Sequence, residues 1–340
     1  MRFFITIEWR REYTYNWRTT FYNGRRPSNR REVGKAHIYK WNVEQGSWGS
    51  GFEIESNERA QDDFLGQVVA INFDGTFVAI GIPGKDIGIN ENNKGRVIFY
   101  KWNGSLGEWE IQRDTINNNK LLIDGTENQE ELPSSLALNS RGNILAVGSK
   151  KVNSDGGTVK VFQLNSNNQF SQLGSDINGE SSGDLSGTSV SLSSDGTILA
   201  IGSPGSNSSG SSSVVSSFTY NNSGQVRIYK YDGTRWNKVG DNINGDGANQ
   251  KFGYCVSLSC DGSRFVAGGG EFYGRPVRVY ETLENLSSYT CPTIPVADPN
   301  SPTTSVANPT TSVANPTTSA SGSTCITRND LDNNYIEYWG

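Results

Sequence analysis

The sequence contains few of the residues on which catalytic and metal-binding centres usually depend. Its 340 residues include four Cys, one Met and one His, and that histidine, His37, lies in an alternating strand pattern. A catalytic triad would have to use His37, yet a packed or half-exposed strand residue is the default interpretation. The cysteines form no CxxC pair and no Cys/His cluster, which argues against a structural zinc site. We therefore predict no enzyme, and no catalytic residue, cofactor or metal ion.

The sequence also has no long hydrophobic run. Its apolar runs have the length of strands, far short of the ~20 residues that a membrane-spanning helix needs. Residues 3–7 are too short for the apolar core of a secretory signal, and Glu8, Arg10 and Arg11 follow at once. We expect no transmembrane segment, and a secreted form would begin upstream of this N-terminus.

Positive charge is concentrated near the N-terminus. The net charge of the chain is -5, but nine basic and three acidic residues give residues 1–35 a charge of about +6. A basic arm can contact nucleic acid or an anionic surface, but no nucleic-acid-binding module follows it. We interpret residues 1–33 as a solvated basic segment and expect no nucleic-acid partner.

The composition favours short strands. Only 34% of the residues are hydrophobic, and they are accompanied by 39 Gly, 14 Tyr and 14 Phe. Four segments share one pattern, in which apolar residues two apart precede an Asp-Gly or Arg-Gly turn. An apolar run then ends in Gly, seven residues after the Asp or Arg. This pattern predicts β-hairpins at residues 69–81, 136–148, 190–202 and 256–268.

A second pair of strands follows each hairpin. The third strands are expected at residues 95–102, 157–162, 224–230 and 277–280, and fourth strands at 109–111, 170–174 and 236–240. One four-stranded sheet cannot bury both of its faces, but sheets packed around a common axis can, as in a β-propeller. Aromatic residues recur at the sheet edges, where packing is favoured over sugar stacking; they are Tyr100, Trp102, Trp109, Tyr229, Tyr231 and Trp236.

At these residues the chain resembles the FG-GAP-like repeats of integrin-α-type β-propellers and of microbial cell-surface proteins. Residues 187–205 and 224–240 carry the resemblance best, and Phe252-Gly253 matches the Phe-Gly element. The resemblance implies an all-β propeller of four-stranded antiparallel blades over residues 34–290.

The resemblance implies four clear blades and a degenerate fifth. The clear blades would span residues 64–113, 132–177, 187–243 and 252–288. The degenerate blade would take outer strands from residues 36–54 and inner strands from residues 1–33, including an alternating segment at 13–17. Equivalent places nearest the centre would be occupied by Val69, Leu136, Val190 and Val256. The segment 203–223, rich in Ser, Asn and Gly, is expected to be a surface loop.

The composition changes after the propeller. Residues 291–324 repeat a Pro-Thr-Thr-Ser-Val-Ala-Asn unit, which cannot form a core and predicts a disordered stalk, either mucin-like or an unmodified linker. Residues 325–340 form a short C-terminal segment. Four cysteines allow three pairings, of which a Cys291–Cys325 bridge would close a loop around the stalk. Cys255 and Cys260 are interpreted as ordinary strand residues.

Candidate sites are few. Asn-X-Ser sequons at Asn103, Asn207, Asn221 and Asn285 fall in expected loops or edges, as glycosylation requires. The recurring turn residues Asp74, Asp195 and Asp261 are interpreted as structural. A calcium loop of the family would resemble Asp-x-Asp-x-Asp-Gly, and the nearest match, residues 242–247, lacks the leading carboxylate, so we expect no calcium.

These observations favour a non-enzymatic extracellular or cell-surface binding or adhesion protein that engages a protein or glycan partner. Two alternatives stay open: a propeller hydrolase or lyase acting on polysaccharide, and a structural repeat fragment without activity. Two close carboxylates with shifted pKa values in an axial pocket would favour the enzyme.

Overall fold

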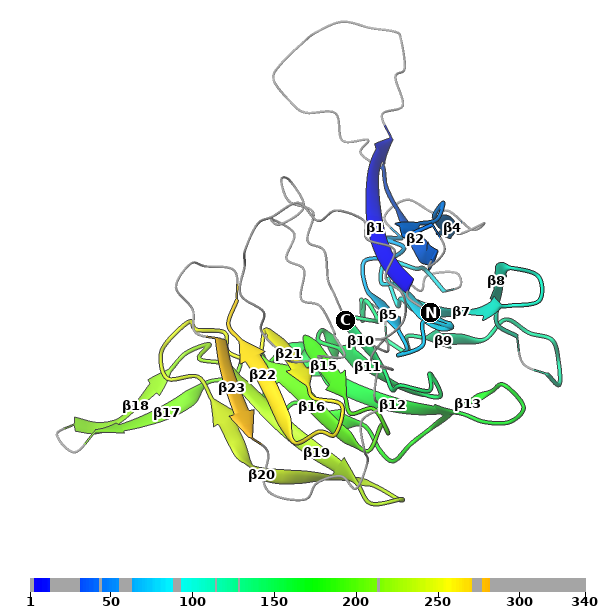
Figure 1. Ribbon diagram of the computed structural model, residues 1–340. Coiled ribbons are helices and arrows are strands. Elements are labelled where there is room, and N and C mark those ends of the chain that lie inside the picture. The colour runs from blue at the N-terminus through cyan, green and yellow to red at the C-terminus, as the bar shows by residue number, and fades with distance from the viewer. Residues whose placement is uncertain are drawn as a thin grey trace, which may run out of the picture.

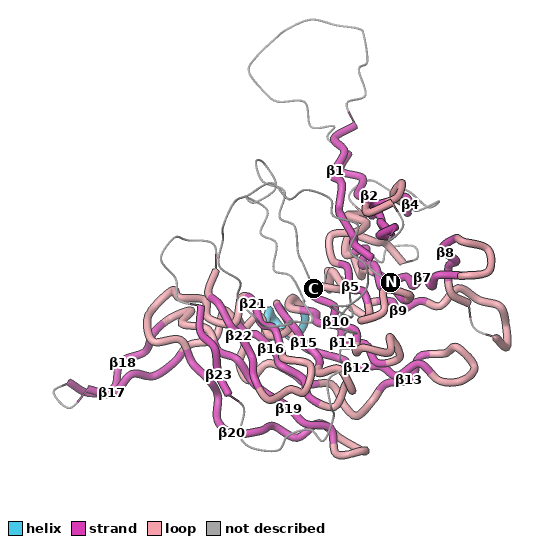
Figure 2. The backbone as a smooth tube through the Cα atoms, viewed as in Figure 1, coloured by secondary structure: helices cyan, strands magenta, loops and turns pink. Residues whose placement is uncertain are grey.

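A computed structural model shows an all-β protein built from a row of antiparallel sheets (Figure 1). It describes residues 3–12, 31–42, 45–54, 63–87, 93–113, 115–127, 129–212, 215–270 and 277–281. In this part of the chain the one helix is the four-residue turn α1 (Val152–Asp155), and no helix is long and apolar enough to cross a bilayer (Figure 2). The all-β part of the predicted fold class is confirmed, and the antiparallel sheets numbered below have three to five strands each.

The sheets follow one another in chain order, and we number them 1 to 5. Sheet 1 holds β1 (Phe3–Glu12), β2 (Arg31–Asn42), β3 (Ser47–Trp48) and β4 (Phe52–Ile54). Sheet 2 holds β5 (Val69–Ile71), β6 (Phe77–Ile82), β7 (Arg96–Asn103), β8 (Glu108–Ile111) and β9 (Leu122–Asp124). Sheet 3 holds β10 (Ser135–Leu138), β11 (Ile144–Ser149), β12 (Thr158–Leu164), β13 (Phe170–Gln172) and β14 (Ile177–Asn178).

Sheets 4 and 5 complete the row. Sheet 4 holds β15 (Ser189–Leu192), β16 (Ile198–Ser203), β19 (Gln225–Tyr231) and β20 (Trp236–Asn244). Sheet 5 holds β21 (Cys255–Leu258), β22 (Arg264–Gly268) and β23 (Val277–Glu281). Each of the four predicted hairpins therefore forms the first two strands of a sheet, and each predicted third strand pairs with the second.

The tight turns of these hairpins are held by short polar side chains. Asp195 Oδ1 accepts hydrogen bonds from the backbone N–H of Thr197 (2.9 Å) and from the Ser193 hydroxyl (2.6 Å). Gly196 then adopts a φ of +77°, which glycine reaches without steric cost. In sheet 3 the corresponding turn carries Arg141, and Asn139 Oδ1 accepts the equivalent backbone bonds instead.

The fourth strand differs between sheets. In sheet 4, β20 pairs with the whole of β19 and contains a register shift between Val226 and Ile228. In sheets 2 and 3 the same edge is shared by two shorter segments, β8 with β9 and β13 with β14. The sequence analysis missed β9 and β14, because strands of two or three residues carry too little alternation to be recognised.

Backbone hydrogen bonds join successive sheets at their turns. The Phe73 N–H donates to the Ser140 carbonyl (3.3 Å), the Ser140 N–H to that of Ser194 (3.0 Å), and the Ser194 N–H to that of Cys260 (2.8 Å). These four residues occupy the same position in their repeats, immediately before the turn Asp or Arg. The first strands β5, β10, β15 and β21 contact one another in the same order.

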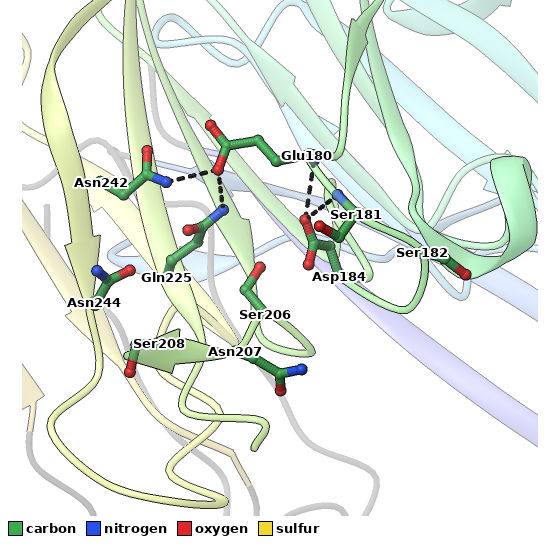
Figure 3. A pocket seen from close by; sticks show the side chains of 10 residues that line it. All are labelled: Glu180, Ser181, Ser182, Asp184, Ser206, Asn207, Ser208, Gln225, Asn242 and Asn244. Carbon is green, nitrogen blue, oxygen red and sulfur yellow. Dashed lines mark hydrogen bonds between the residues drawn. The ribbon is translucent and has the colours of Figure 1, made fainter. Parts of the chain in front are cut away.

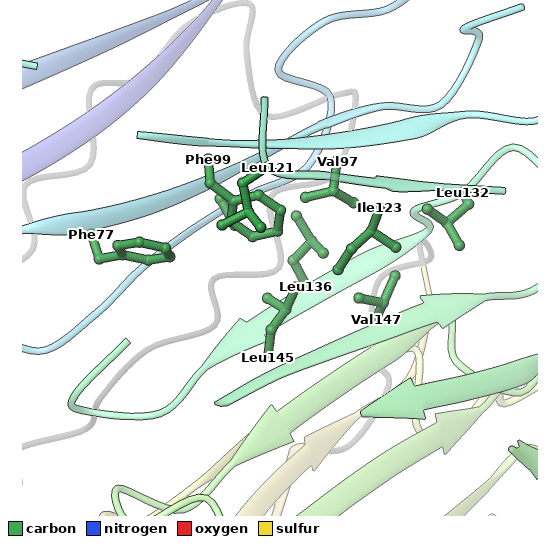
Figure 4. Close-up of a cluster of buried hydrophobic side chains, with 10 residues drawn as sticks. Phe77, Val97, Phe99, Leu121, Ile123, Leu132, Leu136, Leu145 and Val147 are labelled. Carbon is green, nitrogen blue, oxygen red and sulfur yellow. The ribbon is translucent and has the colours of Figure 1, made fainter. Parts of the chain in front are cut away.

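Apolar side chains fill the space between neighbouring sheets (Figure 4). Between sheets 2 and 3, Val97 and Phe99 pack with Leu136, Leu145 and Val147. Similar clusters join sheets 1 and 2, 3 and 4, and 4 and 5. Because each buried Val, Leu or Ile contributes about 1.5–3 kcal/mol, these interfaces are the main source of stability.

The segment 203–223 does not form the predicted loop. It contains a β-hairpin of β17 (Ser208–Ser212) and β18 (Val215–Tyr220), with Ser208 opposite Tyr220. The loop prediction is wrong because the many Ser residues mask the strand preference of Phe218 and Tyr220, which are two residues apart. Residues 3–12 form β1, which pairs antiparallel with β2. The strand expected at 13–17 lies outside the described residues.

The cysteine interpretation also changes. Cys255 and Cys260 are disulfide-bonded, so the view of them as ordinary strand residues is wrong. Both are half-buried. The predicted Cys291–Cys325 bridge, the stalk at 291–324 and the segment 325–340 lie outside the described residues.

Close backbone contact between sheets gives a testable prediction at Gly224. This residue has a φ of +77° and forms a parallel bridge with Phe252 of the next repeat, and an added Cβ would overlap the Phe252 carbonyl. Gly224→Ala should lower the free energy of unfolding by about 3 kcal/mol or more. The control is Gly107→Ala, where φ is +73° with open space around the Cβ, and the cost should be about 1 kcal/mol. Equal losses in urea unfolding would contradict this account.

Candidate functional site

A polar pocket of about 350 Å³ lies beside sheet 4 (Figure 3). Its walls come from the connection between β14 and β15, the loop after β16, and the strands β19 and β20. Every lining side chain carries a carboxylate, amide or hydroxyl group. The lining residues are Glu180, Ser181, Ser182, Asp184, Ser206, Asn207, Ser208, Gln225, Asn242 and Asn244.

The connection that carries Glu180 is fixed by hydrogen bonds at both ends. The Gly179 N–H donates to the Gly157 carbonyl (2.8 Å), and Asp184 Oδ2 accepts from the N–H groups of Glu180 and Ser181 (2.9 Å each). Glu130 accepts an equivalent backbone hydrogen bond one repeat earlier, and Gln250 does so one repeat later. Asp184 is therefore a structural cap, and one of its oxygens is already occupied.

Glu180 is the carboxylate that faces the pocket's amide groups (Figure 3). Its Oε2 accepts hydrogen bonds from Asn242 Nδ2 (2.6 Å) and Gln225 Nε2 (3.3 Å), while Lys238 Nζ lies 3.4 Å from Oε1. Burial opposes ionisation of this group. The hydrogen bonds from Asn242 and Gln225, and the charges of Arg227 and Lys238, outweigh burial and hold the pKa of Glu180 below its ordinary value.

Arg227 lies behind this wall and is 2% exposed. Its Nη1 donates to the Asn178 carbonyl (3.0 Å) and its Nη2 to the Ser186 hydroxyl (2.7 Å), so it ties sheet 3 to sheet 4. Its Nη1 is 4.0 Å from Glu180 Oε1. A buried cation at this distance favours the carboxylate form of Glu180.

The next interface repeats this arrangement. Arg278 occupies the same register position in β23 as Arg227 in β19: each follows the valine that pairs with a glycine of the second strand, Gly268 or Gly202. Arg278 Nη1 donates to Asp246 Oδ1 (2.8 Å), and Asp246 occupies the position of Glu180. The pair raises the pKa of the Arg278 guanidinium, chiefly through that hydrogen bond. An arginine on the third strand facing an acid of the preceding connection is thus a repeated link between sheets.

Two oxygens at the pocket keep unused acceptor capacity. Ser206 is 3% exposed, and neither its Oγ nor Asn242 Oδ1 has a hydrogen-bond partner within the structure. Buried polar atoms are normally satisfied, and an unsatisfied one costs ~1–3 kcal/mol. A small rotation of either side chain would let a hydroxyl or ammonium group of a ligand donate to it.

This arrangement suits recognition by hydrogen bonds. Amides, hydroxyls and an ionised carboxylate together offer donors and acceptors to a polar ligand. A general acid of a glycosidase needs a raised pKa so that it is protonated near neutral pH, whereas the pKa of Glu180 is lowered.

Three of the predicted glycosylation sites lie in the part of the chain that the structure describes. Asn103 lies at the end of β7 and its Nδ2 donates to Glu110 Oε1 (3.0 Å), while Asn221 is exposed in the turn after β18. Asn207 is exposed and lines the pocket, where its Oδ1 accepts from the Asn222 N–H (2.8 Å). Asn285 lies outside the described residues.

The other candidate residues have structural surroundings. In the segment 242–247, which is the nearest match to a calcium loop, Asn242 and Asn244 lie on β20, and Asp246 is paired with Arg278. Within the described residues no three His, Cys, Asp or Glu side chains gather to hold a metal ion. His37 packs beside Tyr39, with ring centroids 6.3 Å apart.

The recurring aromatic residues pack against one another. Trp102 contacts Trp109 edge-on with centroids 5.7 Å apart, and Tyr231 contacts Trp236 at 5.2 Å. Trp236 Nε1 also donates to the Leu173 carbonyl of the preceding sheet (3.0 Å). None of these rings lines the pocket.

Sequence reasoning missed the residues that build the pocket. Glu180, Gln225 and Asn242 are 45 and 17 residues apart in sequence and share no motif. One signal was available in the sequence. The Val-Arg pair recurs at 226–227 and 277–278, so an arginine stands at the same place in two predicted third strands and indicates a repeated role for its charge.

Comparisons with known proteins add little to this geometry. No protein-family model matches the chain, and no curated protein matches it. Among solved structures it is similar to the crystal structure of TolB from Acinetobacter baumannii, with 12% sequence identity and a TM-score of 0.36. The match covers 74% of this chain and 49% of that one, so the match spans about half the length of TolB.

The lowered pKa of Glu180 predicts a pH-dependent contribution to stability. A depressed carboxyl pKa stabilises the fold above the ordinary value of 4.5, and this contribution is lost as the pH falls through the lower folded-state pKa. We expect Glu180→Gln to be less stable than wild type at about pH 7, and the difference to shrink as the pH falls below 4.5 and through the lower folded-state pKa of Glu180. Thermal unfolding across this range measures the difference, with Glu108→Gln on the exposed edge of sheet 2 as the control. A difference that persists unchanged at low pH would refute the assignment.

Proposed function

We propose that this chain is a β-propeller binding protein of an extracellular or cell-surface environment, and that the pocket beside sheet 4 binds a glycan. The observation that carries this proposal is the lining of the pocket, which consists only of amide, hydroxyl and carboxylate side chains. Sugars present many hydroxyl groups that both donate and accept, and this lining offers both partners to them.

The repeat arrangement supports the propeller. Equivalent first strands contact in chain order, and equivalent turn residues form a ladder of backbone hydrogen bonds from sheet to sheet. Sheets related by such a regular step form a row whose curvature follows from the rotation per repeat. In this fold the connections between sheets gather at the ends of the strands, where the pocket lies.

The disulfides and the sequons support the location. Cys255 and Cys260 are both disulfide-bonded, and such bonds persist in oxidising environments such as the cell exterior. Asn207 and Asn221 are exposed, as glycosylation requires. Asn207 lines the pocket, so a glycan attached there would also restrict access to it.

Binding is favoured over catalysis by the state of Glu180. This side chain is held ionised by two amides and two cations, so it is a fixed acceptor rather than a proton donor. Asp184, the second carboxylate, is tied to the backbone of its own connection. A hydrolase acting on polysaccharide requires a protonated acid, and the lowered pKa of Glu180 disfavours that state.

A glycan panel tests this function. Purified full-length protein should bind at least one of the neutral, acidic or amino-sugar-containing oligosaccharides displayed on an array. Asn242→Ala and Glu180→Gln should each weaken that binding by about tenfold. The first removes an amide from the pocket wall, and the second removes the charge of the carboxylate that accepts hydrogen bonds there.

Glu108→Gln is the matched control and should leave affinity unchanged. Silence across the whole panel, or binding that neither pocket substitution affects, would overturn the proposal. Release of reducing sugar from a bound polysaccharide would favour the enzymatic alternative instead.

A further inference from the structure

Sheet 5 exposes an apolar face that is buried in the sheets before it. Its residues Val266, Val277 and Val279 are 38%, 70% and 69% exposed. In sheets 2 to 4 the next sheet of the row covers this face, which we call the outer face of a sheet. Strand register fixes nine counterparts of the three valines, all at most 3% exposed: Ala79, Val97, Phe99, Ala146, Val159, Val161, Ala200, Val226 and Ile228.

Cys255 lies on the outer face of sheet 5. Side chains alternate along β21, and Val256 points into the core shared with sheet 4, so Cys255 points away from that core. In the register of the sheet, Cys255 pairs with Gly268, and Gly268 pairs with Val277. Cys255 therefore stands in the same row of the face as an exposed valine.

In sheets 3 and 4, serines occupy the position of Cys255 and bind the sheet that follows. The Ser135 hydroxyl donates to the Gly187 carbonyl, just before the first strand of sheet 4 (2.8 Å). The Ser189 hydroxyl donates to the Gly253 carbonyl, just before the first strand of sheet 5 (2.8 Å). Each serine pairs with a glycine of the second strand, as Cys255 does, so the three residues are equivalent.

Cys260 also occupies a position that binds the following sheet. It is equivalent to Ser140 and Ser194, which stand immediately before the turn Arg or Asp. The Ser140 hydroxyl donates to the Ser194 carbonyl of sheet 4 (2.8 Å), and the Ser194 N–H donates to the Cys260 carbonyl of sheet 5 (2.8 Å). Both cysteines of sheet 5 thus stand where earlier repeats bind the next sheet.

The two cysteines are disulfide-bonded, but they are too far apart to be bonded to each other. The Ser259 N–H donates to the Arg264 carbonyl (2.8 Å), so the pairing of β21 with β22 continues through Ser259. Four steps of strand separate the Cα atoms of Cys255 and Ser259 by about 13 Å. The single step from Ser259 to Cys260 can shorten this by at most about 4 Å. A disulfide requires Cα atoms within about 7 Å of each other.

We propose that the chain after residue 281 covers the outer face of sheet 5 and is held there by disulfides from Cys255 and Cys260. Their partners are Cys291 and Cys325, the other two cysteines of the chain. Cys291 follows the last residue of β23, Glu281, by ten residues, which can span about 33 Å and so reach either cysteine.

The sequence beyond β23 contains residues suited to this contact. Tyr335, Ile336, Tyr338 and Trp339 follow Cys325, and aromatic and β-branched side chains pack well on the pleated surface of a sheet. The segment takes the place that the next sheet has in earlier repeats. These pairings replace the Cys291–Cys325 bridge expected from the sequence. The contact uses neither the pocket nor its ligand, so it stands independently of the proposed function.

Peptide mapping without reduction tests the disulfides. Trypsin cuts after Lys and Arg, so it releases residues 252–264 with the two cysteines of sheet 5, and residues 279–328 with the other two. A digest of the unreduced full-length monomer should contain these two peptides joined to each other, and dithiothreitol should separate them. Two separate peptides in the unreduced digest, or joined peptides found only in a disulfide-linked dimer, would overturn the proposal.

A lysine on the outer face tests whether the face is covered. Val279→Lys in the full-length protein should lower the unfolding temperature by several degrees, because the segment would bury the charge. Leu106→Lys, on the exposed turn between β7 and β8, is the control and should leave it nearly unchanged. In a Cys255→Ser/Cys260→Ser background, which restores the serines of sheet 4, Val279→Lys should cost at most half as much. Equal costs in both backgrounds would refute the coverage.

Hydrogen exchange makes the same comparison without a substitution. Reduction of wild-type protein with dithiothreitol should speed amide exchange in β22 and β23 at least tenfold, because the covering segment is released. The control is β8, an edge strand of sheet 2, whose exchange should not change. Unchanged exchange in β22 and β23 after complete reduction would contradict the proposal.

Discussion

The need to cover both faces of every sheet governs this structure. Each repeat places apolar side chains on both sides of its second and third strands, as Ile80 and Phe99 do in sheet 2. Removing these faces from water requires a sheet on either side, and the chain supplies them as successive repeats. Glycines such as Gly224, which forms a backbone bridge to Phe252, allow the sheets to approach closely enough for the side chains to interdigitate.

The polar features follow from the same arrangement. Close packing of the strands leaves the connections between sheets as the place where charged groups can gather. Arg227 is buried there because it satisfies the Asn178 carbonyl and the Ser186 hydroxyl across the interface. Its charge in turn helps to keep Glu180 ionised at the pocket. The pocket therefore lies where the connections between sheets meet, and Glu180, Gln225 and Asn242 give it a hydrogen-bonded polar wall.

Burial differs between sheet 5 and sheets 2 to 4. Residues that are fully buried in sheets 2 to 4 are exposed in sheet 5, although their sequence differs little. Val279 and Ile228 have the same register and similar hydrophobicity, but among the described residues only Ile228 is covered by a following sheet. An apolar face of this kind on a protein surface usually marks a contact with a further segment or chain.

The sequence by itself determined the repeat, the hairpins and the order of the strands, because turns such as Asp195-Gly196 and the alternation around them are local signals. It predicted the all-β class and the third strands for the same reason. It did not predict the hairpin of β17 and β18, nor the short strands β9 and β14.

The tertiary structure alone decided the pocket and the interface arginines. Glu180 and Asn242 are 62 residues apart, and their contact depends on how sheet 3 is stacked on sheet 4. The tertiary structure also decided whether an apolar face belongs to the core or to the surface. Burial depends on which sheet lies next to that face, and the residue pattern of a single strand does not contain this information.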